Sequence, residues 1–292
     1  MNRPICRRIL IAGLVLAAVG APERASAGPW TPEPGEGYAK VWFKWLPGFA
    51  YIDGEGNAQS YGTYHELFFS AYGEVGIAPG LALTLHSDLV RGFWLEDPVA
   101  DEVRSHVAPG DPALGLRVRL LQVDRFVLSL EGSVRAPLAT GDGVQSFRST
   151  DPGNPELGSL RIGAGVWDFL GGVQAGYAWD TVYVAGGVAF IGRTNDYEHI
   201  LHWTVEAGMN FTERIAGRAR VTGHYALGNG DAPPDETPSG LGNGTSYTGA
   251  ALEGDYRIGD RWFVGLSLEG GLFLIQRQTG GPVVSVYLAT KF

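Results

Sequence analysis

The last eleven residues of the chain, 282–292, alternate between two kinds of side chain. Counting back from the carboxy end, every second position can face an apolar environment: Phe292, Thr290, Leu288, Val286 and Val284. The positions between them are smaller or more polar: Lys291, Ala289, Tyr287, Ser285 and Val283. A period of two residues is the repeat of a β-strand, whose successive side chains point to opposite faces of a sheet. The segment is therefore predicted to be a strand with one apolar face.

The same period recurs along the rest of the chain. It predicts twelve strands, at residues 38–46, 64–75, 81–90, 113–121, 126–138, 165–179, 181–193, 199–211, 218–227, 246–257, 262–275 and 282–292. The connections between them alternate between short and long. The short ones lie at 78–80, 122–124, 180, 212–217 and 258–260, and the others at 52–62, 95–111, 140–158, 194–198, 228–244 and 280–281.

This rhythm of connections is typical of one fold class. Outer-membrane barrels have short turns on the periplasmic side and mostly longer loops outside, whereas a soluble sandwich has no reason to keep that order. The sequence therefore predicts an all-β fold, a twelve-stranded antiparallel up-and-down transmembrane β-barrel with both chain ends on one side. The pattern is compatible with about 10 to 14 strands.

Aromatic residues on the apolar face favour the same fold. Near the short turns and the carboxy end, this phase carries Phe126, Tyr177, Trp179, Phe211, Tyr256, Trp262 and Phe292. Near the long loops it carries Trp45, Phe93, Trp167, Phe190, Trp203 and Tyr225. Two aromatic rings at opposite ends of an apolar band are the girdles of a barrel embedded in lipid.

The amino-terminal residues have the features of an export signal. Arg3, Arg7 and Arg8 precede an apolar run at 9–19, and a small-residue cleavage site follows at 25–27. We therefore expect residues 1–27 to be a cleaved signal peptide and 28–292 to be the barrel domain, located in the outer membrane of a Gram-negative cell. The only cysteine, Cys6, would leave with the peptide. Residues 28–37, which show no apolar period, are predicted to be a periplasmic tail.

The charge balance excludes some functions. The predicted signal peptide contains four Arg and one Glu, so its removal changes the formal net charge from −9 to −12. A nucleic-acid partner is disfavoured by that sign. After residue 27 no apolar run is long enough to span a bilayer as a helix.

The other face of the predicted strands is strongly charged. Its cations are Lys40, Lys44, Arg117, Arg119, Arg135, Arg218, Arg220, Arg257 and Lys291. Its acids are Glu66, Glu74, Asp88, Glu131, Asp168, Glu206, Glu253, Asp255 and Glu269, and His86 shares this face. Charges facing a lumen must pair with one another or line a hydrated path. Two interpretations stay open: a sealed interior stiffened by salt bridges, and a solute pore with an electric field across it.

Catalytic and metal sites are weakly indicated. His202 and Glu206 share one strand face, but two steps along a strand separate them by roughly 13 Å, too far for joint ligation of a metal ion. An outer-membrane lipid hydrolase would need a Ser beside a His on the outer surface, and His199 is the only His that we place on the outward phase. We therefore expect no catalytic residues, no metal site and no cofactor.

Two segments in the middle of the chain carry a family resemblance. Residues 110–117 read Gly-Asp-Pro-Ala-Leu-Gly-Leu-Arg, and residues 136–142 read Ala-Pro-Leu-Ala-Thr-Gly-Asp. They resemble the Gly-Asp entry and the Pro-x-x-Thr-Gly-Asp exit of a mid-barrel strand in the outer-membrane family named after a phenol meta-degradation pathway. Where that family usually has Pro-Thr-Gly, this chain has Leu138 and Ala139 inserted after Pro137.

The resemblance implies a passive channel or transporter for small molecules, often hydrophobic or aromatic. The terminal Phe292 is similar to the aromatic residue that the barrel-assembly machinery reads at the end of outer-membrane barrels. The expected partners are outer-membrane lipid and lipopolysaccharide, that machinery and a small-molecule solute, with the barrel acting as a monomer. The alternatives are a sealed structural or surface-interaction barrel without transport, and a lipid hydrolase.

Overall fold

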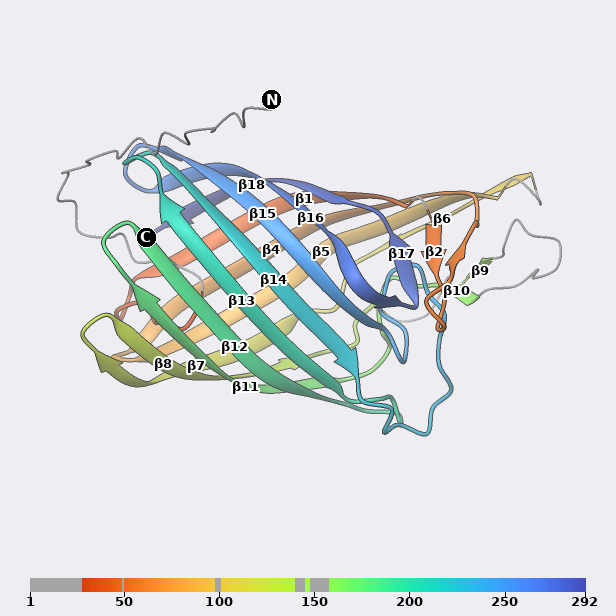
Figure 1. Cartoon of the computed structure of the whole chain (residues 1–292), viewed down its shortest axis with the longest axis horizontal. Coiled ribbons are helices and arrows are strands. Elements are labelled where there is room, and N and C mark those ends of the chain that lie inside the picture. The colour runs from red at the N-terminus through yellow and green to blue at the C-terminus, as the bar shows by residue number, and fades with distance from the viewer. Residues whose placement is uncertain (1–27, 49, 98–100, 140–144, 148–157) are drawn as a thin grey trace, which may run out of the picture.

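The computed structural model describes residues 28–292 apart from 49, 98–100, 140–144 and 148–157. The described residues form an all-β protein in which twelve antiparallel strands close into a barrel (Figure 1). The twelve strands are β1 (Gly37–Gly48), β4 (Thr63–Ala78), β5 (Leu81–Asp97), β7 (Ala113–Val123), β8 (Phe126–Arg135), β11 (Asp168–Ala178), β12 (Val182–Arg193), β13 (Ile200–Asn210), β14 (Ile215–Ala226), β15 (Ser246–Ile258), β16 (Trp262–Gln276) and β18 (Val283–Lys291). The predicted fold class is confirmed, while the predicted signal peptide, 1–27, lies outside the described residues.

The last strand closes the ring. Each strand of the barrel pairs with the next one along the chain, and β18 pairs with both β16 and β1. The seam between β18 and β1 runs from Tyr38 opposite Lys291 to Trp45 opposite Val284. Since every backbone donor and acceptor of a strand in lipid needs a partner, this closure is what allows the sheet to cross a bilayer. None of the described residues forms a helix long and apolar enough to cross a membrane.

The outer surface of the barrel is apolar. In β18 the alternate residues Val284, Val286 and Leu288 are exposed, whereas Ser285 and Tyr287 between them are buried. Most aromatic residues that the sequence assigns to the outer face are exposed or half-buried, and Trp45, Trp179 and Trp262 are each at least 40% exposed. An outer face made of such side chains suits the hydrocarbon interior of a membrane.

Phe93 is an exception, because the prediction that it faces outward is wrong. Its side chain is only 2% exposed. In the pairing of β4 with β5, Phe69 lies opposite Val90 while Ser70 lies opposite Asp88, which leaves Leu89 as an extra residue in β5. A β-bulge of this kind reverses the phase of the strand beyond it. Phe93 therefore turns inward.

The predicted long loop at 95–111 is also partly wrong. β5 continues to Asp97, and β6 (Glu102–Ala108) pairs back along it. Figure 1 shows this hairpin projecting from the end of the barrel that carries the longer connections. The short strands β2 (Ala50–Ile52), β3 (Ala58–Gln59), β9 (Gln145–Phe147), β10 (Gly158–Leu160) and β17 (Gln278–Gly280) lie at the same end. Most of the predicted loop 140–158 lies outside the described residues.

Candidate functional site: the barrel interior

Ion pairs between strands that are far apart in the ring define the inner face. Lys40 of β1 lies 2.9 Å from Glu253 of β15, although β18 and β16 separate these two strands in the wall. Arg218 of β14 bridges Glu253 and Asp255, at 2.5 and 2.7 Å. Contacts of this reach are possible on the concave side of a closed sheet, where side chains converge. Lys40, Arg218, Glu253 and Asp255 thus form one network.

A second pair stands on the neighbouring part of the wall. Arg117 of β7 lies 2.9 Å from Glu74 of β4, and both side chains are buried. The Tyr72 hydroxyl also donates to Glu74, at 2.7 Å. A buried ion pair is tolerated only when its desolvated atoms find such further partners.

Arg91 belongs to a buried pair that the sequence did not indicate. Its guanidinium donates to the Glu66 carboxylate, which also accepts a hydrogen bond from the Tyr64 hydroxyl at 3.0 Å. The remaining guanidinium nitrogens donate to the main-chain oxygens of Ile162 and Ser239, at 3.3 and 3.2 Å. Arg91 was missed because the predicted strand ended at residue 90 and the bulge at Leu89 changed its phase.

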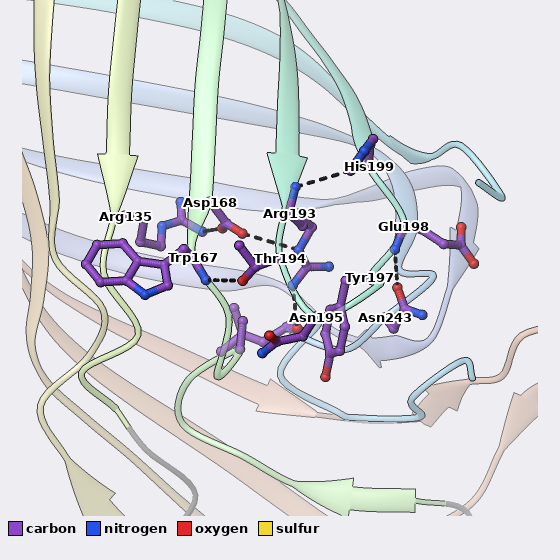
Figure 2. Close-up of polar contacts among 12 residues, drawn as sticks. Arg135, Trp167, Asp168, Arg193, Thr194, Asn195, Tyr197, Glu198, His199 and Asn243 are labelled. Atoms are coloured by element: carbon purple, nitrogen blue, oxygen red, sulfur yellow. Dashed lines mark hydrogen bonds and ion pairs between the residues drawn. The ribbon is translucent and has the colours of Figure 1, made fainter. Parts of the chain in front are cut away.

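Arg193 of β12, four strands from β5 in the ring, makes a similar set of contacts (Figure 2). Asp168 lies 3.3 Å from Arg193 and 3.0 Å from Arg135. Arg193 also donates to the main-chain oxygens of Leu241 and Gly242, both at 3.4 Å. The sequence placed Arg193 at the end of a strand but did not assign it to the interior.

These two arginines hold the connection between β14 and β15 across one end of the barrel. Arg91 of β5 and Arg193 of β12 bind residues 239–242 of this single connection. Glu236 accepts a hydrogen bond from Tyr51 and lies 3.1 Å from Arg277. Burial and the bond to Glu236 raise the pKa of Tyr51, so its hydroxyl stays a donor. The connection at 228–244, which the sequence predicted only as a connection between strands, is therefore a folded cover.

The amino-terminal segment enters the barrel from the other end. Ser129 of β8 donates to the main-chain oxygen of Pro29, and the Trp30 ring packs edge-on against Tyr183 of β12 at 5.6 Å. A Cβ atom at Gly176 would lie 2.7 Å from Pro29 and 2.8 Å from Trp30, so a glycine is needed there. The prediction that residues 28–37 form a periplasmic tail is wrong for its first part, because residues 28–31 pack against the inner wall.

A cavity of about 530 Å³ lies between the amino-terminal segment and the cover. Gly28 and Pro29 line it on one side, and Pro238 and Ser239 line it on another. Its wall carries Glu66, Glu206, Arg220 and Glu269 among the predicted interior residues. Arg220 lies 3.9 Å from Glu206 and 4.0 Å from Glu269. We call this space the chamber.

No ion pair within the described part of the chain involves the predicted interior residues Lys44, His86, Asp88 and Glu131. The Trp42 ring lies 5.1 Å from the Lys44 ammonium and stacks on His86 at 5.7 Å. Asp88 accepts a hydrogen bond of 2.5 Å from Ser70. Glu131 lies opposite Arg117 in the pairing of β8 with β7.

Two further predicted cations lie near the short turns. Arg119 is 3.9 Å from Glu33 and donates to Gln122 at 2.7 Å. Arg257 donates to the main-chain oxygens of Gly259 and Asp260, both at 3.0 Å. Arg119 and Arg257 therefore serve this end of the barrel and lie outside the chamber.

His65 lies on the outer surface in addition to the predicted His199. His65 accepts a hydrogen bond of 3.2 Å from the Trp45 indole and packs against the Trp94 ring at 4.6 Å. His199 accepts from the main-chain N–H of Arg193 at 3.2 Å. In both cases the hydrogen-bond donor to the imidazole is an indole or a backbone amide. In the described residues, no group of three or more His, Cys, Asp or Glu side chains could hold a metal ion.

Searches of protein-family models and of curated protein sequences find no match to this chain. Its fold is similar to that of solved outer-membrane structures. The COG4313 outer membrane channel from Pseudomonas putida F1 superposes with a TM-score of 0.60 at 11% sequence identity, over 94% of this chain and 100% of that chain. The NanC porin superposes with a TM-score of 0.53 at 7% identity, over 87% of this chain and 100% of that chain. At these identities the likeness is one of fold.

Proposed function

We propose that this protein is an outer-membrane channel for the passive passage of small molecules. One observation carries the proposal: a closed wall with an apolar outer face surrounds a polar chamber of about 530 Å³. A barrel that served only as an anchor would have no need of that space. The likeness in fold to a channel and a porin supports the same function, as does the resemblance of residues 110–117 and 136–142 to the phenol meta-degradation family.

The proposed setting follows from the outer surface. The apolar band faces outer-membrane lipid, and the end with the longer connections faces lipopolysaccharide. The exposed Phe292 ring is at the end of the closing strand, where the barrel-assembly machinery would read it. The pore-lining residues would be those of the chamber, Glu206, Arg220 and Glu269, together with Lys44, Asp88 and Glu131.

The test is uptake into liposomes that contain the folded, purified protein. We expect small aromatic solutes to enter these liposomes faster than liposomes that contain heat-denatured protein. Planar-bilayer recordings on the same sample should show discrete conductance steps. A folded sample that gives neither uptake nor conductance would contradict the proposal.

One observation favours a second function, that of a sealed structural barrel. The amino-terminal segment and the cover each bind the wall, and most interior charges are paired. A sealed barrel would resist solutes even when the amino-terminal segment is removed. The deletion described in the Discussion therefore separates the two functions.

A further inference from the structure

The chamber has a wall with three ordered rows of side chains. Pairing of β13 with β14 sets His202 opposite His224, Thr204 opposite Thr222, and Glu206 opposite Arg220. Each row continues onto the neighbouring strands. The first row is aromatic, the second is neutral and polar, and the third is charged.

The aromatic row ends at Tyr247. Its ring stacks on His224 at 5.2 Å with an interplanar angle of 15°, and His224 meets His202 edge-on at 6.0 Å. Tyr247 and His202 both line the chamber. A planar or aromatic body can pack against such a row by offset stacking or edge contacts.

The charged row has more acid than base. Glu206 and Glu269 share the single Arg220, at 3.9 and 4.0 Å. The other acid that lines the chamber, Glu66, is already neutralised by Arg91. Counting Arg91, the side chains that line the chamber thus carry one more negative than positive charge, which a bound cation would balance and a bound anion would increase.

The neutral row and His202 add polar atoms that lack a hydrogen-bond donor. The side-chain oxygens of Gln174 and Thr204 and the Nδ1 atom of His202 are buried and have no hydrogen-bond partner in the described structure. All three residues line the chamber. Gln174 Oε1 can only accept a hydrogen bond, and the other two atoms can accept one. Buried polar atoms without partners are rare in proteins, and rotation of these side chains toward the chamber would let the N–H groups of a ligand satisfy them.

We propose that the chamber is the binding site for a small molecule that has a protonated amine on a planar or aromatic body. The ammonium group lies beside the row of Glu206, Arg220 and Glu269, where the acids outnumber the base, and the body packs against His202 and Tyr247. The inference rests on the proposed channel function, because it names the class of solute that the channel selects. It does not require the solute to leave on the other side.

The test compares three molecules of similar shape: benzylammonium, benzyl alcohol and benzoate. Calorimetric titration of the folded full-length protein in detergent at pH 7 should show benzylammonium binding about tenfold more tightly than benzyl alcohol, or about 1.4 kcal/mol. Benzoate should bind more weakly than the alcohol. Equal binding of the three molecules, or a preference for benzoate, would overturn the proposal.

Two substitutions locate the site. Glu206→Gln and Glu269→Gln each remove one charge at nearly constant volume, and each should reduce the preference for benzylammonium over benzyl alcohol about tenfold. Glu213→Gln makes the same change of charge on an exposed turn and should leave the preference unaltered. An equal loss in all three variants would show that binding follows net charge and would refute the chamber as the site.

Binding and passage are measured separately, so the two proposals fail in different ways. If benzylammonium binds in detergent but enters no liposome, the proposed channel function is contradicted and the proposed amine-binding site stands. If all three molecules enter liposomes at one rate and none binds preferentially, the proposed amine-binding site is contradicted and the proposed channel function stands.

Discussion

At the scale of single residues, the Arg91–Glu66 pair shows the desolvation cost of burying charges in the barrel interior. Glu66 has no exposed surface, and Arg91 is 4% exposed. Each charge is tolerated because the other is present, and because Tyr64 and two main-chain oxygens satisfy their remaining atoms. Loss of one partner leaves the other charge buried and alone.

We therefore expect Arg91→Met to destabilise the folded barrel by about 3 to 5 kcal/mol, the usual cost of breaking a buried ion pair. Urea unfolding in detergent, followed by tryptophan fluorescence, gives the free energy. The double variant Arg91→Met with Glu66→Gln should recover part of the loss, since no lone charge is then buried.

The control is the exposed pair of Arg125 and Asp180, whose side chains are 48% and 71% exposed at a separation of 2.7 Å. Arg125→Gln should cost less than about 1 kcal/mol, as surface ion pairs do. An Arg91 variant that is as stable as the Arg125 variant would show that the interior is hydrated enough to screen the charge of Glu66.

At the scale of elements, two segments outside the barrel strands determine how open the lumen is. The amino-terminal segment packs against β8, β11 and β12 from one end, and the connection between β14 and β15 covers the other. The cover is anchored by main-chain oxygens that bind Arg91 and Arg193. The amino-terminal segment has fewer such bonds and is the easier of the two to displace.

Deletion of residues 28–33 should increase the single-channel conductance in planar bilayers, because it removes Pro29 from the chamber wall and the Trp30 ring from its contact with Tyr183 inside the barrel. Trp30→Ala should give a smaller increase. Trp179→Ala, which removes an exposed indole near a short turn, is the matched control and should leave conductance unchanged. A deletion variant that folds but conducts no better than the full protein would support the sealed barrel.

The strands themselves could be predicted from the sequence, because a period of two residues is a local signal. β12 ends at Arg193 and β15 begins at Ser246, as the alternation predicts. Arg91 and Phe93 could not be placed, because the bulge at Leu89 reverses the phase of β5 beyond it, and the position of a bulge depends on the pairing with the partner strand.

The segments that fill the lumen could not be predicted for a related reason. Residues 28–37 and 228–244 are rich in Gly and Pro, which marks a segment without regular structure but does not say where it goes. Their positions depend on Ser129, Arg91 and Arg193, which are distant in the sequence. The assignment of the charged residues to a solute path stays a prediction, and the uptake experiment tests it.

At the scale of the whole molecule, the barrel is complete in one chain. The ring of twelve strands closes on itself within one chain. A closed ring has no open edge in its membrane part that a second copy would need to cover.

We therefore expect a monomer. Light scattering on the protein eluting from size exclusion, corrected for bound detergent, should give the mass of one chain. Chemical crosslinking in liposomes should leave that band unchanged as the protein-to-lipid ratio rises. A stable trimer at low protein-to-lipid ratio would contradict this expectation.

The pairing of β18 with β1 has a consequence for biosynthesis. The nine residues from Val283 to Lys291 supply the hydrogen bonds for two neighbours at once, β1 and β16. A polypeptide that lacks these residues keeps the other eleven barrel strands. The edges of β1 and β16 then expose unpaired backbone N–H and C=O groups to hydrocarbon. We therefore expect that a polypeptide truncated before Val283 does not insert stably into a bilayer.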